Sequence, residues 1–332
     1  MPRLLTEVTE IATALGTLVP DLARGIAERP GRLLNVDDVV WDRVVAAYEN
    51  HEHFASFDVA FANGAALLQA EDGLRGRPPK LVEWKGPHRP PGDDVVPADI
   101  RIDHVYQVSC KYLSRVMQNA GPARLFDRLL IGEDRSKDDW FAAVAPREYH
   151  TFYRAVCASL TLDLPTMIAD LLPPHRAVLK EALRPRRLPS SAQSSWHDVC
   201  RAVSAESAAR WATNLGTLRT KVRLLWRLLR IGDAPYFVLG TDGQAHLRLR
   251  VASTWDWYQA FELQSFVVAP REAGQPEVEW RAIARDRVSG ADIEVRGHVE
   301  IRWSHGRFQG SPEAKIYLDS PLTAVPGYFL LV

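Results

Sequence analysis

The sequence predicts an α+β fold, with an N-terminal α/β core that carries a helical insert and a mostly antiparallel, β-rich C-terminal domain. Apolar residues recur at three- and four-residue spacing in residues 35–69 and 140–232, which is typical of helices. Two-residue alternation runs through residues 99–111 and returns from Tyr236 onward, which indicates strands. The chain of 332 residues also exceeds the size at which a single core usually stops growing, so we expect two domains.

The composition indicates a folded protein with no global electrostatic preference for a partner. Hydrophobic residues make up 46% and charged residues 25% of the chain, which is the balance of an ordinary globular protein. Because 41 basic residues balance 41 acidic ones, any contact with nucleic acid must come from a local patch. The irregular spacing of Cys110, Cys157 and Cys200 fits neither a disulfide framework nor a zinc site, so we expect a reducing, cytoplasmic location.

Residues 1–34 are predicted to form one or two amphipathic N-terminal helices. Glu7, Glu10 and Asp21 interrupt the apolar residues of this segment. It therefore lacks the continuous apolar run of a signal peptide or a membrane span, and we expect no membrane partner.

Two helices and a short strand are expected next. A helix is predicted from Asn35 to about Phe54 and a second one over residues 57–69, because their apolar residues fall on one helical face. The apolar run of residues 81–84 lies between prolines, which is typical of a short strand bounded by stiff loops.

A hairpin is predicted over residues 99–111. Charged residues alternate with isoleucine in residues 99–103, which indicates a strand with one buried face. A turn at Asp103 and His104 then returns the chain as a strand over residues 105–111. The polar faces of the two strands of a hairpin lie on the same side of the sheet. The side chains expected on that side are Asp99, Asp103, Ser109 and Lys111.

After this hairpin the pattern predicts a helix over residues 113–120, ended by Gly121 and Pro122. Residues 140–232 follow as a mainly helical region in which residues 183–195 are the best candidate for a linker. Hairpin signals and strict alternation then mark the last hundred residues as β-rich. The predicted divisions are residues 1–34 for the N-terminal helices, 35–182 for the core domain, 183–232 for a basic helical linker region and 233–332 for the β-rich domain.

An acid on one strand, facing an acceptor and a lysine on the next, suits hydrolysis of a phosphodiester. At neutral pH this reaction needs a divalent ion that generates hydroxide and stabilises charge on the phosphate. Mg²⁺, with Mn²⁺ as a substitute, is expected, because it binds through few carboxylates together with water and substrate oxygens. A neighbouring lysine would neutralise the developing charge. The expected catalytic residues are Asp99, Asp103, Ser109 and Lys111.

The order helix, strand, Asp-bearing strand, strand ending in x-Lys, and helix resembles the PD-(D/E)xK nuclease superfamily over residues 35–130. The resemblance implies a restriction-endonuclease-like core in which Asp99 binds metal and Lys111 is the lysine of the (D/E)xK half. The implied function is a metal-dependent DNA endonuclease in restriction or phage defence. A homodimer and a complex with a partner subunit both stay open, because the sequence carries no signal for a dimer.

The chain departs from the superfamily pattern at Ser109, which stands where the second acid is expected. Some restriction-type members are similar in having no acid there. Since the superfamily often draws a glutamate from the preceding helix, the resemblance implies that such a residue supplies the missing charge. The expected metal ligands are Asp99, Asp103, Glu49 and Glu52.

Several alternatives stay open at this point. The hairpin residues could be ordinary surface charges that pair across strands. The chain could instead be a non-catalytic subunit that binds DNA or protein through a degenerate nuclease core, or its activity could lie in the C-terminal domain. Two rival ExK strings, Glu83-Trp84-Lys85 and Glu313-Ala314-Lys315, lack a following helix. His298 and Glu300 share a strand face, but no further zinc ligand is implied by spacing.

A basic run between residues 219 and 230 surrounds an apolar helical stripe and predicts contact with a DNA backbone. The solvated basic face of a core helix is the alternative. Trp255, Trp257 and Tyr258 could stack on bases or belong to a core. The expected nucleic-acid-binding residues are Arg219, Lys221, Arg223, Arg227 and Arg230, with Arg186 and Arg187 adding to the patch.

Overall fold

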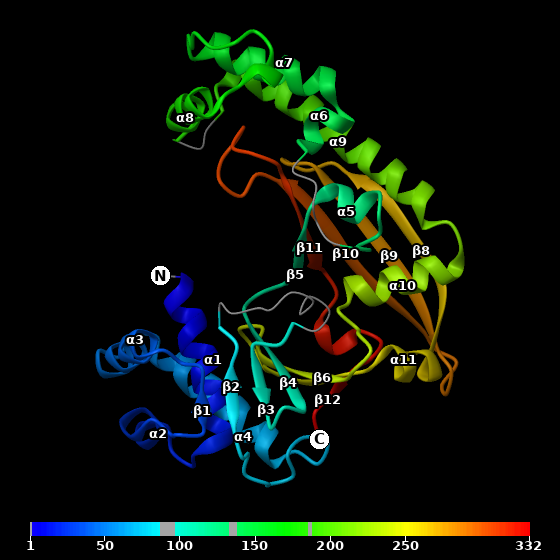
Figure 1. Ribbon diagram of the computed structural model, residues 1–332. Coiled ribbons are helices and arrows are strands. Elements are labelled where there is room, and N and C mark those ends of the chain that lie inside the picture. Colours follow the sequence, from blue (N-terminus) through cyan, green and yellow to red (C-terminus); the bar gives the residue numbers. More distant parts are fainter. Residues whose placement is uncertain (1, 87–96, 133–137, 185–187) are drawn as a thin grey trace. The chain divides into compact units, whose positions relative to one another are not determined.

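The computed structural model describes residues 2–86, 97–132, 138–184 and 188–332 and has a mixed α+β fold (Figure 1). The chain forms two compact units. Unit 1 comprises Met1–Ser114, Arg230–Phe261 and Pro321–Val332, and unit 2 comprises Arg115–Leu229 and Glu262–Ser320.

The units are therefore not consecutive segments of the chain. The predicted core domain of residues 35–182 and the predicted β-rich domain of residues 233–332 each contribute to both units. The strands of the last hundred residues are present as expected, but they belong to two different sheets. Composition shifts along the sequence could not reveal this division, because it depends on which distant strands pair.

Unit 1 is built on a seven-stranded mixed sheet with the strand order β1-β2-β3-β4-β6-β7-β12. The pairs β1–β2 and β4–β6 are parallel, and the other neighbouring pairs are antiparallel. The strands are β1 (Leu33–Leu34), β2 (Val82–Trp84), β3 (Ile100–Ile102), β4 (Tyr106–Tyr112), β6 (Tyr236–Thr241), β7 (His246–Val251) and β12 (Tyr328–Leu330). The helices are α1 (Pro2–Leu18), α2 (Leu22–Glu28), α3 (Asp38–Glu49), α4 (Phe54–Gln69), α11 (Thr254–Ala260) and the 3₁₀ helix η2 (Leu322–Ala324).

The β3–β4 hairpin and its turn confirm the local prediction. Asp103 and His104 both adopt left-handed backbone angles, with φ of 50° and 60°. The Val105 N–H donates to the Ile102 carbonyl at 3.0 Å and closes the turn. Two left-handed residues in a tight turn match the right-handed twist of the flanking strands, and this turn fixes the register of the hairpin.

Helices α1 and α4 approach each other closely within unit 1. A Cβ atom placed on Gly16 would lie 2.1 Å from the Phe61 carbonyl oxygen. One placed on Gly64 would lie 2.0 Å from the Thr13 carbonyl oxygen. The two helices therefore cross backbone against backbone, which only glycine permits at these positions.

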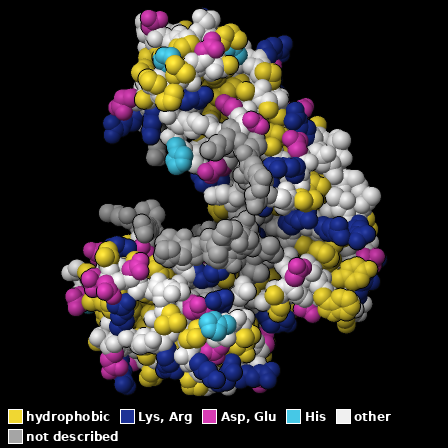
Figure 2. Space-filling view, viewed as in Figure 1, with side chains coloured by type: hydrophobic (Ala, Val, Ile, Leu, Met, Phe, Trp, Pro, Cys, Tyr) yellow, Lys and Arg dark blue, Asp and Glu magenta, His cyan; other side chains and the backbone are white. Residues whose placement is uncertain are grey.

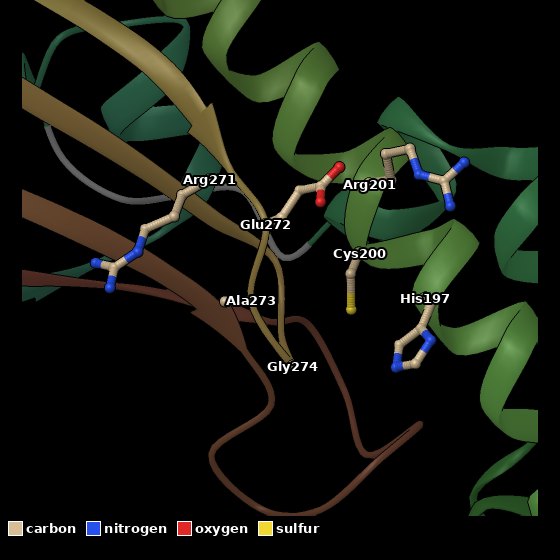
Figure 3. A pocket seen from close by; sticks show the side chains of 7 residues that line it. All are labelled: His197, Cys200, Arg201, Arg271, Glu272, Ala273 and Gly274. Atoms are coloured by element: carbon tan, nitrogen blue, oxygen red, sulfur yellow. The ribbon is translucent and has the colours of Figure 1, made fainter.

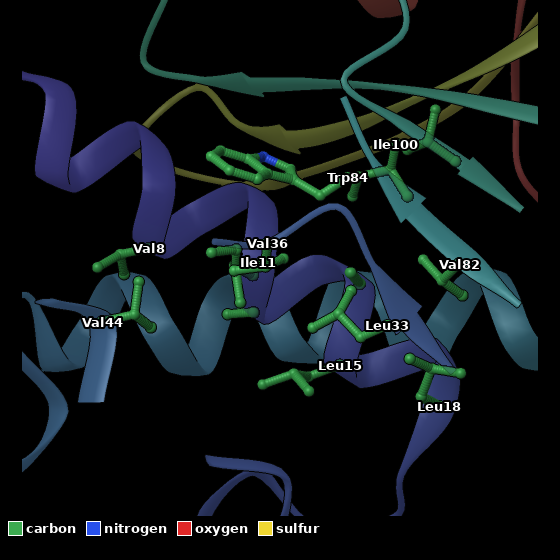
Figure 4. Packing of buried hydrophobic residues seen from close by; sticks show 14 of the residues in the cluster. Val8, Ile11, Leu15, Leu18, Leu33, Val36, Val44, Val82, Trp84 and Ile100 are labelled. Carbon is green, nitrogen blue, oxygen red and sulfur yellow. The ribbon is translucent and has the colours of Figure 1, made fainter. Parts of the chain in front are cut away.

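The apolar core of unit 1 lies between these helices and the sheet (Figure 4). Val8, Ile11 and Leu15 of α1 are fully buried and share one cluster with Val82 and Ile100 of the strands. Helix α1 packs against β2 and β4, whereas α4 packs against β6 and β7. Burial of each such side chain contributes about 1.5–3 kcal/mol to folding, so this layer fixes α1 above the hairpin.

One buried polar side chain joins α4 to the sheet. Asn63 is fully buried, and its Nδ2 donates to the Gly240 carbonyl at 2.8 Å. Its Oδ1 accepts from Arg248 Nε at 2.9 Å and lies 2.9 Å from His246 Nδ1. A buried amide without partners would cost about 1–3 kcal/mol, so these bonds favour this one placement of α4 over β6 and β7.

Unit 2 is built on a five-stranded sheet with the order β5-β11-β10-β9-β8, against which the long helix α9 packs. The strands are β5 (Val116–Ala120), β8 (Phe261–Arg271), β9 (Glu277–Asp286), β10 (Asp292–Arg302) and β11 (Glu313–Leu318). The helices are α5 (Pro122–Phe126), α6 (Trp140–Val144), α7 (Pro146–Ser159), η1 (Ile168–Asp170), α8 (Pro173–Ala182), α9 (Ser190–Leu215) and α10 (Leu218–Leu228).

Two local predictions are corrected in this part of the chain. Residues 116–120 form β5 rather than the expected helix, because they pair with β11 in the register Ala120 to Ala314. Pairing with a strand almost two hundred residues away overrides the local helical spacing. The expected linker 183–195 is also wrong in its second half, where α9 begins at Ser190. Arg186 and Arg187 lie outside the described residues.

All three cysteines are free, which agrees with the expectation that they form no disulfide framework. Across the described ranges, no helix combines the length and apolar character needed to cross a membrane.

We expect Gly64→Ala to lower the free energy of unfolding by about 1–3 kcal/mol, the usual cost of forcing extra atoms into a packed interface. The new methyl group would collide with the backbone of α1, which cannot rotate away. Urea denaturation followed by circular dichroism would measure the change. Gly31→Ala is the matched control, because no atom lies within 4 Å of its added Cβ. Equal stability of the two variants would contradict the close crossing.

Candidate functional site

Asp99 lies at the start of β3 and is held by the backbones of both neighbouring strands. Its N–H donates to the Val108 carbonyl at 2.8 Å, and its carbonyl accepts from the Lys85 N–H at 2.9 Å. Its carboxylate Oδ2 accepts the Cys110 N–H at 2.7 Å and lies 3.5 Å from the Ser109 hydroxyl. Asp99 is only 8% exposed. The carboxylate is thus fixed at the end of the strand, next to β4.

Lys111 extends this site along β4. Alternation places Ser109 and Lys111 on one face of the strand and Cys110 on the other. Cys110 packs against the core cluster beneath α1, as expected for an apolar-facing residue. Lys111 pairs with Gly240 of β6, where an added Cβ would lie 1.7 Å from the Lys111 carbonyl oxygen. The two strands therefore approach closely beside the lysine.

Glu10 of α1 supplies a second buried carboxylate at the same end of the sheet. It is 8% exposed, and its Oε2 accepts the Trp84 indole N–H at 2.6 Å. Trp84 ends β2 and pairs with Ile100, the residue that follows Asp99. Glu10 therefore reaches the ends of β2 and β3 from the helix above them.

Burial and nearby charges both act on the pKa of the Cys110 thiol. Burial raises the pKa of Cys110 well above its ordinary value, and the negative charges of Asp99 and Glu10 raise it further. A hydrogen bond with Thr13 and the positive charge of Lys111 lower that pKa. The thiol thus stays protonated and inert at neutral pH. Asp99 and Glu10 thus both lie near the Cys110 thiol, whereas strand alternation places the Lys111 side chain on the opposite face of β4.

These donors suit a hard divalent cation. Asp99 and Glu10 offer carboxylates, and Ser109 offers a hydroxyl oxygen. Mg²⁺ typically binds through one or two carboxylates and keeps several waters, which such a set can satisfy. In the described part of the chain, no group of three or more His, Cys, Asp or Glu residues could hold a metal ion. A closed four-ligand zinc site is thus not formed by those residues.

The structure does not bring the other predicted acids to Asp99. Asp103 accepts the N–H groups of Lys80 at 2.7 Å and Leu81 at 3.1 Å, at the turn end of the hairpin. It lies four residues along the strand, on the order of 13 Å from Asp99. Glu49 and Glu52 are exposed, at the end of α3 and in the loop before α4. The expected set of four carboxylate ligands is therefore not assembled.

Glu10 is the residue that sequence reasoning missed. The predicted glutamate was sought on the helix of residues 35–54, whereas α1 is the helix that packs on β2 and β4. A signal was present in the sequence: Glu10, Thr13 and Thr17 recur at three- and four-residue spacing and are all buried. Polar residues on the buried face of a helix indicate a site or a polar network.

The rival sites have other partners. Glu83 accepts from Arg101 Nε at 2.7 Å and lies 3.1 Å from His104 Nδ1. The hydrogen bond with Arg101 lowers the pKa of Glu83. His298 Nδ1 lies 2.8 Å from Asp319, so it belongs to the polar face of the second sheet. Glu83 and His298 therefore each take part in a local contact.

The predicted basic residues divide between the two units. Arg219, Arg223 and Arg227 follow one another at four-residue spacing on α10, which places them on one face. Lys221 falls on a different face of the same helix. Arg230 lies beyond α10 in unit 1, with a left-handed φ of 57°, and is not part of that face. Burial raises the pKa of Tyr236 to about 12, and the charge of Arg230 opposes this.

A surface pocket of about 360 Å³ opens in unit 2 between α9 and the β8–β9 connection (Figure 3). Burial raises the pKa of the Cys200 thiol to about 12, so the thiol is protonated at neutral pH. The cations beside it are paired, Arg201 with Asp198 at 3.5 Å and Arg271 with Glu277 at 3.4 Å. We therefore assign the candidate site to unit 1 rather than to this pocket.

Comparison with known proteins leaves the site to be interpreted on its own geometry: no family model, no curated protein and no solved structure matches this chain.

Proposed function

We propose that the chain is a metal-dependent endonuclease that hydrolyses phosphodiester bonds of DNA at the end of the β3–β4 hairpin. The observation that carries this proposal is the pair of buried carboxylates, Asp99 and Glu10, at the adjoining ends of β3 and β2, next to β4 with Ser109 and Lys111. The hydrogen bond from the Cys110 N–H to Asp99 Oδ2 supports it, because this bond fixes one carboxylate in place.

In this proposal Asp99 and Glu10 hold Mg²⁺ or Mn²⁺, and Ser109 lies beside Asp99 as a neutral oxygen donor. The ion supplies a hydroxide nucleophile and charge neutralisation when it is bound. Lys111 places a positive charge beside the reacting phosphate and stabilises the charge that develops there. Fixed backbone contacts keep Asp99 from rotating during the reaction.

The likeness to the PD-(D/E)xK superfamily gains support from the position of Asp99 at the head of one strand and of Lys111 near the end of the next. The acid missing at Ser109 is replaced, in our proposal, by Glu10 from the first helix. Asp103, Glu49 and Glu52 are left out of the metal site for the reasons given above.

A second candidate function is a non-catalytic subunit that binds DNA or protein. The observation that favours it is the serine at position 109, which leaves two acids rather than three at the site. In that case the buried carboxylates would have a structural role only, and the fold would not respond to divalent ions.

The proposed site cannot be tested by removing the residues after Arg230, because β6, β7 and β12 complete the sheet that carries it. Such a truncation would unfold unit 1 whichever unit holds the activity. Point variants of the full chain are therefore required.

We expect Asp99→Asn, Lys111→Met and Glu10→Gln each to reduce Mg²⁺- or Mn²⁺-dependent cleavage of plasmid DNA by at least about 100-fold, the usual effect of losing one preorganised charge. Gel electrophoresis of the DNA over time would measure the rate. Glu10→Gln keeps an acceptor for the Trp84 indole, so its loss of activity would report charge rather than folding.

The matched controls are Asp103→Asn and Glu49→Gln, which change acids away from Asp99. Both should cleave DNA at the wild-type rate. Wild-type activity in Asp99→Asn would remove the hairpin from the proposal, and loss of activity in Glu49→Gln would restore the α3 acid that we exclude.

Mn²⁺ at a concentration 100 times its dissociation constant should stabilise the native state by about 2.7 kcal/mol, since it binds folded protein only. Differential scanning fluorimetry with Mn²⁺ or with EDTA would show the resulting rise in melting temperature. Asp99→Asn and Glu10→Gln should abolish the rise, and Asp103→Asn should retain it. An unchanged wild-type melting temperature would favour the non-catalytic subunit.

A further inference from the structure

A linear stripe of arginines lies on unit 2, outside the proposed hydrolytic site. Arg219, Arg223 and Arg227 follow one face of α10 at four-residue spacing. Their Cα atoms span about 12 Å at the rise of an α-helix. Figure 2 shows Lys and Arg side chains gathered over α10. The three arginines therefore form an extended basic surface along the helix.

Arg124 of α5 adds a fourth positive charge near Arg227, at the C-terminal end of this stripe. Arg227 is half-buried and donates from Nη1 to the Leu129 carbonyl at 2.9 Å, which draws it towards the turn after α5. Burial lowers the pKa of Arg227, and the positive charges of Arg223 and Arg124 lower it further. Arg124 belongs to α5. The positive charges of Arg223 and Arg227 on α10 and of Arg124 on α5 therefore repel one another.

Among the described residues, no Asp or Glu forms an ion pair with any of the four arginines. Most other arginines of unit 2 do have such partners, for example Arg285 with Asp292 at 2.8 Å. Like charges one helical turn apart destabilise a helix. An anion that binds the stripe would relieve that cost.

The form of the surface decides which anion it fits. Leu224, Leu225 and Leu228 of α10 are fully buried, and Leu218 is exposed at the first position of the helix, so the exposed side of α10 carries arginines rather than a continuous apolar face for a lipid surface. Arginine presents a planar fork that matches phosphate oxygens. A duplex carries about one charge per 1.7 Å of its axis, so several phosphates lie within the length of the stripe.

We propose that Arg124, Arg219, Arg223 and Arg227 form a binding surface for the phosphate backbone of nucleic acid. This surface is additional to the hydrolytic site, and it does not depend on the identity of the metal ligands. It would hold DNA without reading its sequence, because phosphate contacts carry no base information.

The test is binding of a fluorescent duplex DNA to the full-length Asp99→Asn protein in EDTA, measured by anisotropy over a range of NaCl concentrations. Cleavage plays no part in this measurement, so its outcome is separate from that of the proposed hydrolysis. Each phosphate contact contributes about 0.9 to the slope of log affinity against log salt. Arg219→Ala with Arg223→Ala should therefore lower the slope by about 2 and weaken binding at low salt.

Two controls keep the result specific. Lys221→Ala removes a positive charge from another face of the same helix and should leave the slope unchanged. Arg219 and Arg223 are exposed, so their replacement should not lower the melting temperature, and a loss of binding would then not reflect a loss of folding. Arg124→Ala should lower the slope by about 1.

Three results would overturn the proposal. The first is an unchanged slope in the Arg219→Ala and Arg223→Ala double variant. The second is an equal loss in Lys221→Ala, which would mean that net charge alone attracts the DNA. The third is binding to phosphatidylserine vesicles with no binding to DNA at the same salt concentration, which would identify a lipid surface as the partner.

Discussion

The crossing of α1 and α4 at Gly16 and Gly64 is the constraint on which unit 1 depends. Because no side chain separates the two backbones, α1 lies deep enough for its own side chains to reach the sheet. Thr13 Oγ1 lies 2.7 Å from the Tyr112 hydroxyl of β4, and Glu10 binds the indole of Trp84. A wider crossing would lift both contacts away from the strands, so the geometry of the candidate site begins with two glycines.

Asp99 and Glu10 are buried, and their hydrogen bonds to uncharged N–H groups fix their positions. Glu83 and Asp292 are neutralised by arginines at 2.7 Å and 2.8 Å. Asp99 accepts from the Cys110 backbone amide at 2.7 Å, and Glu10 accepts from the Trp84 indole N–H at 2.6 Å. Removing a carboxylate from water costs free energy, which the hydrogen bonds that it accepts offset in part. Two such carboxylates at adjoining strand ends are therefore the feature on which the proposed cation site rests.

Local structure could largely be predicted from the sequence. The helices near the N-terminus, the Asp103-His104 turn and the placement of Asp99 beside Ser109 all follow from short-range periodicity and turn chemistry. What could not be predicted depends on distant pairing. Residues 116–120 have helical spacing, and their pairing with β11 near residue 314 is not visible in the local sequence. Asp103 shares a strand face with Asp99, but alternation alone does not show that the two residues lie at opposite ends of that strand. The position of Glu10 could not be predicted either, because tertiary packing decides that α1 covers β2 and β4.

The division of unit 1 into three chain segments has a consequence for how the protein is made. As the chain leaves the ribosome, Glu10, Asp99 and Lys111 emerge early, but the parallel neighbour of β4 is not synthesised until residues 236–241. Until then the edge of β4 that will pair with Gly240 stays open, and an open edge favours pairing with other chains. The last strand of the sheet, β12, comes only at residues 328–330. The order of synthesis thus delays completion of the sheet beneath the proposed catalytic groups until residues 328–330 are made, so a shorter nascent chain would carry these groups without the strands that align them.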